Sequence, residues 1–178
     1  MFLPKVLQFS SYIYRHMLFV SIFSFAGYVT AINQENTARE SIEEGDTTIQ
    51  HLLNNYSAFN LNYQAYEVKN KIGLSNIEGL EVLILFGTWC HDSLREVPRM
   101  LRILESEGIL PNQISLILLS LKKTEPNRRD IFFNIRKTPT FIFLMHDKEV
   151  GRIVESPLVS LEAELNNIFD ISKTYEQK

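Results

Sequence analysis

The chain has 178 residues and one cysteine, Cys90, so any sulfur chemistry is confined to this position. A single cysteine forms no internal disulfide and supplies no multi-cysteine zinc or iron–sulfur site. Cys90 lies in the sequence Trp89-Cys90-His91-Asp92-Ser93, just before a predicted helix. The free backbone N–H groups and the dipole at a helix N-terminus favour the thiolate, which is the nucleophilic form of cysteine. We therefore expect a reactive thiol whose covalent partner comes from outside the chain.

The side chains that follow Cys90 should tune its acidity. Ser93 lies three residues further on, where a side chain in the first helical turn faces back toward the sulfur. Its hydroxyl can then donate a hydrogen bond to a thiolate. A protonated His91 would lower the pKa of the thiol, whereas an ionised Asp92 would raise it. The sequence leaves the balance between these two side chains open.

A second segment of interest is Thr138-Pro139-Thr140, which stands immediately before a predicted strand. Proline cannot donate a hydrogen bond to the ladder of a central strand. Its position here therefore favours a cis peptide bond before Pro139. We expect this bond to lie opposite Cys90.

The hydrophobic pattern predicts the elements that position these residues. Continuous apolar runs predict buried strands, and apolar residues at a helical spacing predict amphipathic helices. In chain order we predict strand 82–86, helix 93–107 with Pro98 inside it, strand 114–121, and a short helix or turn at 130–135. Strand 141–145, hairpin turn 146–148, strand 150–154 and helix 160–171 follow, with Ser160 as the N-cap of the last helix. An alternating first half followed by an antiparallel hairpin predicts an α/β fold, a mixed central sheet with helices on both faces.

These motifs together resemble the thioredoxin superfamily over roughly residues 80–170. Trp89-Cys90-x-x-Ser93 is similar to its W-C-x-x-C motif, Pro98 to its helix proline, and Ile135 to Thr140 to its I-R-x-x-P-T motif. The surrounding residues look most like bacterial exported thioredoxin-like proteins. The resemblance implies a thioredoxin-like fold in which Trp89, Thr138 and Pro139 hold the extended chain of a partner. The candidate site residues are Cys90 and Ser93 as catalytic residues and Trp89, His91, Asp92, Thr138 and Pro139 as substrate-binding residues.

Two departures from the family pattern bear on function. Ser93 stands where the family has its resolving cysteine, and Ile84 stands where thioredoxins carry a buried acid. A mixed disulfide on Cys90 therefore has no internal thiol to release it, which argues against a dithiol cycle. We expect a monothiol thiol–disulfide oxidoreductase with the C-x-x-S motif. It would form mixed disulfides with thiol- or disulfide-bearing protein clients, and an external reductant or small thiol would resolve them.

Two other functions remain open at this point. The chain could be a redox-silent thioredoxin-fold binding module for an envelope protein. A peroxidase-like or glutathione-dependent enzyme would instead need a basic group beside the thiolate, for which Arg95 and Arg136 are candidates. We expect no metal and no cofactor. The net charge of −3 argues against a nucleic-acid partner, because such proteins carry a basic stripe.

The N-terminal residues predict export. Residues 1–31 contain Lys5 and Arg15 but no acidic residue, and Met17 to Ala31 form an uncharged apolar run. This pattern is typical of a secretory signal peptide, with an uncleaved anchor as the alternative. We expect a periplasmic monomer, or a membrane-anchored form that faces the periplasm through this segment. Residues 32–58 predict a helical extension, either one helix or two broken at Gly45 and Asp46, and residues 59–178 the thioredoxin-like domain.

Overall fold

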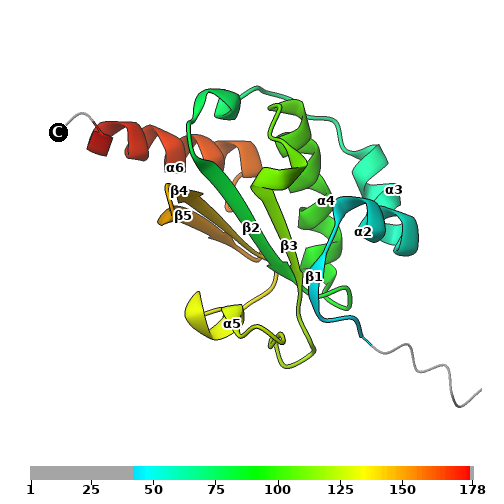
Figure 1. Cartoon of the computed structure of the whole chain (residues 1–178). Helices are drawn as coiled ribbons and strands as arrows, with labels where there is room; N and C mark the ends of the chain where they lie inside the picture. Colours follow the sequence, from blue (N-terminus) through cyan, green and yellow to red (C-terminus); the bar gives the residue numbers. More distant parts are fainter. Residues whose placement is uncertain (1–41, 177–178) are drawn as a thin grey trace, which may run out of the picture. The chain divides into compact units, whose positions relative to one another are not determined.

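The computed structural model describes residues 42–176, with side chains to residue 170 (Figure 1). The predicted signal peptide or anchor, and the first residues of the predicted extension, lie outside the described residues. No helix of the described part is long and apolar enough to cross a membrane. Residues from Ile42 onward form one compact unit.

A five-stranded mixed sheet forms the centre of this unit, with the strand order β1-β3-β2-β4-β5. The strands are β1 (Gly45–Thr47), β2 (Leu80–Phe86), β3 (Ile114–Leu118), β4 (Thr140–Met145) and β5 (Lys148–Val154). Strands β2 and β3 are parallel, and every other neighbouring pair is antiparallel. His146 and Asp147, both with positive φ, form the predicted hairpin turn between β4 and β5.

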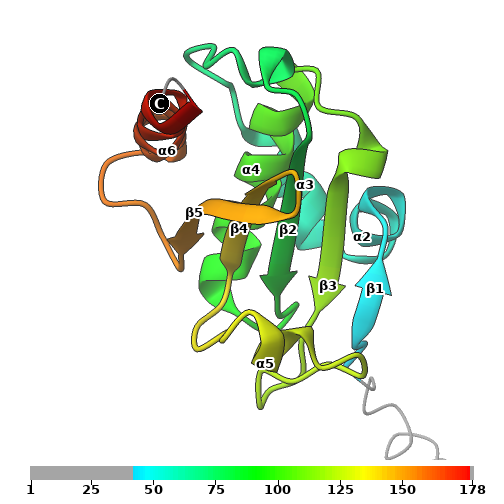
Figure 2. The ribbon, with the colours of Figure 1, turned by 60° about the vertical axis from the view of Figure 1, so that its left-hand side comes forward.

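The helices lie on both faces of the sheet, as predicted. The elements are α2 (Ile49–Asn55), α3 (Ser57–Ala65), η1 (Leu74–Asn76), α4 (His91–Ser106), η2 (Pro111–Gln113), α5 (Arg129–Phe132) and α6 (Leu161–Glu176). Figure 2 shows α3 and α4 behind the sheet and α5 in front of its lower end. The fold is therefore the α/β, thioredoxin-like arrangement that the sequence predicted.

The alternation of side chains along β2 explains why this strand is buried on both faces. Val82, Ile84 and Phe86 enter the larger core cluster, which includes residues of α2, α3, α4 and α6. Leu83 and Leu85 point to the opposite face, where Phe133 packs against them. The buried strand predicted at 82–86 is confirmed. Its packing on both faces holds the end of β2, from which the chain continues to Cys90.

The N-terminal extension differs from its prediction. Gly45 to Thr47 form an edge strand rather than a break between helices, because they pair antiparallel with β3. The predicted boundary between residues 58 and 59 falls inside α3, which packs on α4. Gly45 pairs with Leu118, so the chain enters the sheet at the carboxyl end of β3.

Other boundaries also differ from the prediction. Helix α5 ends at Phe132 rather than at residue 135, β5 begins at Lys148 rather than at residue 150, and α6 ends at Glu176 rather than at residue 171. Strand β3 ends at Leu118 rather than at residue 121, because a turn follows in which the Ser120 N–H donates to the Thr124 carbonyl at 3.0 Å. Helix α4 begins at His91 rather than at Ser93, which makes Cys90 its N-cap. Pro98 lies inside α4, as predicted.

Candidate functional site

Cys90 joins the tight turn after β2 to the first turn of α4. Its N–H donates to the Gly87 carbonyl at 3.0 Å, and its own carbonyl accepts the first helical hydrogen bond from Leu94 at 3.0 Å. The backbone of Cys90 is extended (φ −88°, ψ 126°), and no side chain caps the helix. The sulfur thus stands at the N-terminus of a 16-residue helix, where backbone N–H groups are free to interact with it.

The structure brings the two predicted segments together. The thiol donates to the Thr138 carbonyl oxygen, with an Sγ–O distance of 3.2 Å. The Thr138–Pro139 peptide bond is cis, as the sequence predicted. Thr138 is buried, whereas Cys90 is partly exposed and therefore within reach of a partner from solvent.

The surroundings lower the pKa of the Cys90 thiol. Burial alone raises it, because a thiolate is poorly solvated there. Hydrogen bonds from the side chains of Thr138 and Ser93, and from the backbone N–H groups of Ser93 and Asp92, outweigh the burial. The Sγ–H bond to the Thr138 carbonyl is made only by the protonated form and is given up on ionisation. The net result is a thiol more acidic than an ordinary cysteine.

Ser93 is completely buried in the first turn of α4. Its hydroxyl has no hydrogen-bond partner in the described part of the chain while Cys90 is a thiol. A buried hydroxyl without a partner costs free energy, and a thiolate would supply the missing acceptor. Ser93 can therefore stabilise the charged form of Cys90 as a hydrogen-bond donor, although it cannot release a mixed disulfide as a thiol would.

Trp89 is held firmly beside the sulfur. Its indole Nε1–H donates to the Leu119 carbonyl at 3.1 Å. A Cβ on Gly87 would lie 2.4 Å from the indole ring, so only glycine leaves room for this ring position. The Nζ atom of Lys123 lies 5.9 Å from the ring centroid, within cation–π range. Sequence reasoning missed Gly87, Leu119 and Lys123, because their contacts with Trp89 depend on the fold.

Asp92 does not act as an isolated negative charge beside the thiol. Its carboxylate binds the Arg95 guanidinium at 2.8 Å, and Arg95 also binds the buried carboxylate of Glu96 at 2.5 Å. His91 is exposed at the first position of α4. The three-residue spacing of Asp92 and Arg95 on a helix is the sequence signal that would have found this pair.

The two candidates for the basic group of a peroxidase-like site, Arg95 and Arg136, bind other side chains instead of the thiol. Arg95 is shared by two carboxylates, and Arg136 donates to the Asn134 side-chain oxygen at 2.8 Å. Ile84, at the position of the family's buried acid, is fully buried in the apolar core. Among the described residues, no three His, Cys, Asp or Glu side chains gather as metal ligands would.

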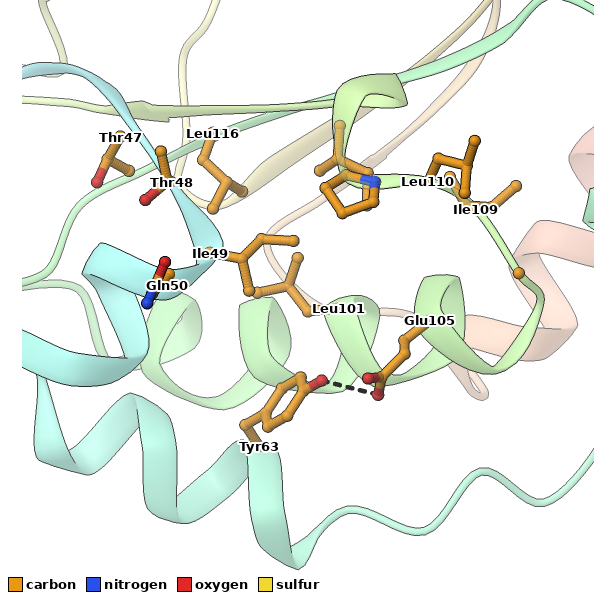
Figure 3. Close-up of a pocket in the computed structure, with 13 residues that line it drawn as sticks. Thr47, Thr48, Ile49, Gln50, Tyr63, Leu101, Glu105, Ile109, Leu110 and Leu116 are labelled. Atoms are coloured by element: carbon orange, nitrogen blue, oxygen red, sulfur yellow. Dashed lines mark hydrogen bonds between the residues drawn. The ribbon is translucent and has the colours of Figure 1, made fainter.

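A separate pocket of about 780 Å³ lies between β1, α2 and the second half of α4 (Figure 3). Leu101 in its wall is eleven residues along the helix from Cys90, a distance of about 16 Å. The Tyr63 hydroxyl donates to the Glu105 carboxylate at 2.7 Å, and the Arg102 guanidinium lies over the Tyr63 ring. Tyr63 and Glu105 of this pocket are thus paired with each other, and the pocket is distinct from the thiol site.

Comparisons with known proteins concern the fold. No protein-family model matches the chain, and no curated protein matches it. Among solved structures, the chain is similar to a protein of unknown function from Pseudomonas aeruginosa, with 17% identity, a TM-score of 0.48, and coverage of 74% of this chain and 93% of the other.

Two thioredoxins are also among the similar structures. Reduced thioredoxin pre-protein of Schistosoma mansoni is 22% identical, with a TM-score of 0.36 and coverage of 53% of this chain and 80% of the other. Thioredoxin f2 of Chlamydomonas reinhardtii is 15% identical, with a TM-score of 0.39 and coverage of 52% and 81%.

Proposed function

We propose that the chain catalyses monothiol thiol–disulfide exchange at Cys90. The observation that carries this proposal is a partly exposed thiol of lowered pKa at the N-terminus of α4, in contact with Thr138. A cysteine kept only for packing is buried and inert, whereas a reactive one occupies a partly exposed position that favours the thiolate.

The first step forms a mixed disulfide. The Cys90 thiolate attacks one sulfur of a client disulfide, a new bond forms between Cys90 and that sulfur, and the client's own S–S bond breaks. The second client sulfur leaves as a thiolate and takes a proton from solvent. The N–H groups of Asp92 and Ser93 and the Ser93 hydroxyl stabilise the attacking thiolate.

The second step needs a thiol from outside, because the chain has no second cysteine. An external thiol, from a reductant or a small molecule, attacks the mixed disulfide. The Cys90–client bond breaks, a disulfide forms between the external sulfur and the client sulfur, and Cys90 returns as a thiolate. The external thiol gives its proton to solvent, and each step breaks one disulfide bond and forms one, so the cycle needs no other oxidant or reductant.

The remaining candidate residues surround the sulfur and form the proposed client surface. Trp89 and the Thr138–Pro139 peptide flank the thiol, with His91 and the Asp92–Arg95 pair at the rim. We further propose that the protein is exported as a monomer by residues 1–31, into a compartment where disulfides persist. Its clients would be thiol- or disulfide-bearing proteins.

The test is the pH dependence of Cys90 alkylation by iodoacetamide, together with trapping of mixed disulfides on non-reducing gels. We expect half-maximal reactivity below the pKa of free cysteine, about 8.5. Trapped adducts should vanish on reduction and in Cys90→Ser. The matched variant Ser93→Cys should shorten their lifetime, because it supplies an internal resolving thiol.

Two results would overturn the proposal. One is a thiol pKa at or above that of free cysteine. The other is partner capture by Cys90→Ser equal to that of the wild type, which would support the redox-silent binding module instead.

A further inference from the structure

The segment between β3 and β4 contacts the thiol site and carries an excess of positive charge. Residues 120–137 contain six basic residues, namely Lys122, Lys123, Arg128, Arg129, Arg136 and Lys137. The only acidic residues in the segment 120–137 are Glu125 and Asp130, and both are buried. This local excess contrasts with the net charge of −3 of the whole chain.

Only two of these six cations are neutralised by carboxylates in the described structure. Arg129 binds Glu125 at 3.0 Å and Asp46 at 2.6 Å, and Lys137 binds Glu155 at 2.6 Å. The other four form no ion pair with any described side chain; they are Lys122, Lys123, Arg128 and Arg136.

Two carboxylates near this segment are neutralised, in contrast to these cations. Asp92 is paired with Arg95, and Glu155, whose N–H donates to the Pro139 carbonyl at 2.7 Å, is paired with Lys137. The uncompensated charge of residues 120–137 is therefore positive on balance. A positive rim raises the local concentration of anionic partners and repels cationic ones.

Two of the unpaired lysines, Lys122 and Lys123, lie in a tight turn, residues 120–124, which we name the lysine turn. The Lys123 N–H donates to the Ser120 carbonyl at 2.9 Å, and the Ser120 and Thr124 hydroxyls are 2.8 Å apart. Lys123 then lies over Trp89, the residue before Cys90. Leu121, in the same turn, is 62% exposed. In Figure 2 the segment that follows β3 lies at the carboxyl end of the strand.

We propose that Cys90 exchanges preferentially with disulfides in acidic polypeptide segments, which the lysine turn binds through Lys122 and Lys123 and through the exposed side chain of Leu121. This inference rests on the proposed thiol–disulfide exchange and specifies its substrate class. Aspartate or glutamate residues near the client cysteine would pair with the lysines. An apolar client side chain would contact Leu121 and Trp89.

The test uses two synthetic peptides of equal length, each with one cysteine as a 2-thiopyridyl mixed disulfide. One peptide carries glutamates beside the cysteine, and the other carries lysines at the same positions. The release of 2-thiopyridone gives the second-order rate constant of the full-length protein with each peptide. We expect the acidic peptide to react about tenfold faster at low salt. The ratio should approach one at 1 M salt, where the Debye length is about 3 Å.

A pair of charge-reversal variants assigns the effect to the lysine turn. Lys122→Glu with Lys123→Glu should abolish or invert the preference. Lys69→Glu with Lys71→Glu makes the same charge change at exposed positions between α3 and η1. This control variant should keep the preference for the acidic peptide. Equal rates for the two peptides, or an equal loss of the preference for the acidic peptide in both double variants, would overturn this inference and leave the exchange function intact. Failure of both peptides to react would instead overturn the proposed function.

Discussion

At the scale of single residues, the acidity of Cys90 depends on groups that lie within one turn of it. The Ser93 and Asp92 N–H groups stabilise the thiolate, but the Asp92 carboxylate on the same turn opposes it. Arg95 binds that carboxylate and is held in turn by the buried Glu96. We interpret Arg95 as a positioning residue, which neutralises Asp92 without touching the sulfur.

Arg95→Met should therefore make Cys90 less reactive near neutral pH. The uncompensated Asp92 carboxylate would raise the pKa of the thiol and slow alkylation at pH 7 by roughly threefold. The double variant Asp92→Asn with Arg95→Met should bring the pH profile back toward that of the wild type, because the Asp92 carboxylate beside the thiol is then absent. A profile that shifts equally in the single and the double variant would show that Arg95 acts through structure rather than charge.

Ser93→Ala separates stability from reactivity at one position. Because the Ser93 hydroxyl is buried without a partner, its removal should leave the free energy of unfolding unchanged or raise it by up to about 1 kcal/mol. The same change should raise the pKa of Cys90, since the thiolate loses a donor. Urea unfolding and the pH dependence of alkylation measure the two effects. A large loss of stability with no pKa change would contradict this assignment.

At the scale of elements, Glu125 holds the lysine turn and α5 in place. Its carboxylate accepts hydrogen bonds from the Asn127 N–H at 3.0 Å and from the Arg129 N–H at 2.6 Å, besides its ion pair with the Arg129 guanidinium. Burial raises the pKa of Glu125, but these bonds outweigh it and lower the pKa to about 2. Arg129 extends the network to Asp46 on β1.

The stability of the fold should accordingly fall in acid. Because the folded pKa of Glu125 is below its ordinary value of 4.5, its stabilisation is present above pH 4.5 and is lost as pH falls toward 2. Between pH 6 and pH 3 the wild type should lose about 2 kcal/mol more than Glu125→Gln does. Urea unfolding at the two pH values measures this difference, and equal losses would show that Glu125 is not the group responsible.

The elements themselves were predictable to different degrees. The apolar runs of β2 and β4 and the Thr138–Pro139 segment carry local signals that survive in the fold. Strand β1 carries none, because Gly45 to Thr47 become a strand only by pairing with β3. The Ser120–Thr124 turn and the position of Lys123 over Trp89 likewise depend on contacts between distant segments. The basic residues of 120–137 can be read from the sequence, but the contact of this segment with Trp89 could not be predicted, whereas the position of the thiol could.

At the scale of the whole molecule, Glu107 connects the end of α4 to the long segment between α3 and β2. This buried carboxylate accepts the backbone N–H groups of Ile72 and Gly73 at 2.7 Å and that of Leu74 at 2.9 Å. Charge-assisted hydrogen bonds of this kind are about twice as strong as neutral ones. Glu107 thus supplies acceptors for three backbone groups at the entrance to η1.

Glu107→Gln should lower the free energy of unfolding by about 2–3 kcal/mol, because the amide presents one acceptor and turns a donor toward the remaining N–H groups. Glu67→Gln, at an exposed position of the same segment, should change it by less than about 0.5 kcal/mol. Urea unfolding measures both. Similar values for the two variants would show that the Glu107 bonds contribute little.

The antiparallel direction of β1 has a practical consequence for experiments. Gly45 pairs with Leu118, so the described chain starts at the end of the sheet where Trp89 and Cys90 lie. The last turns of α6 leave the molecule at the opposite end in Figure 1. An affinity tag or a surface tether is therefore best attached after residue 178, where it leaves the sulfur accessible to large probes.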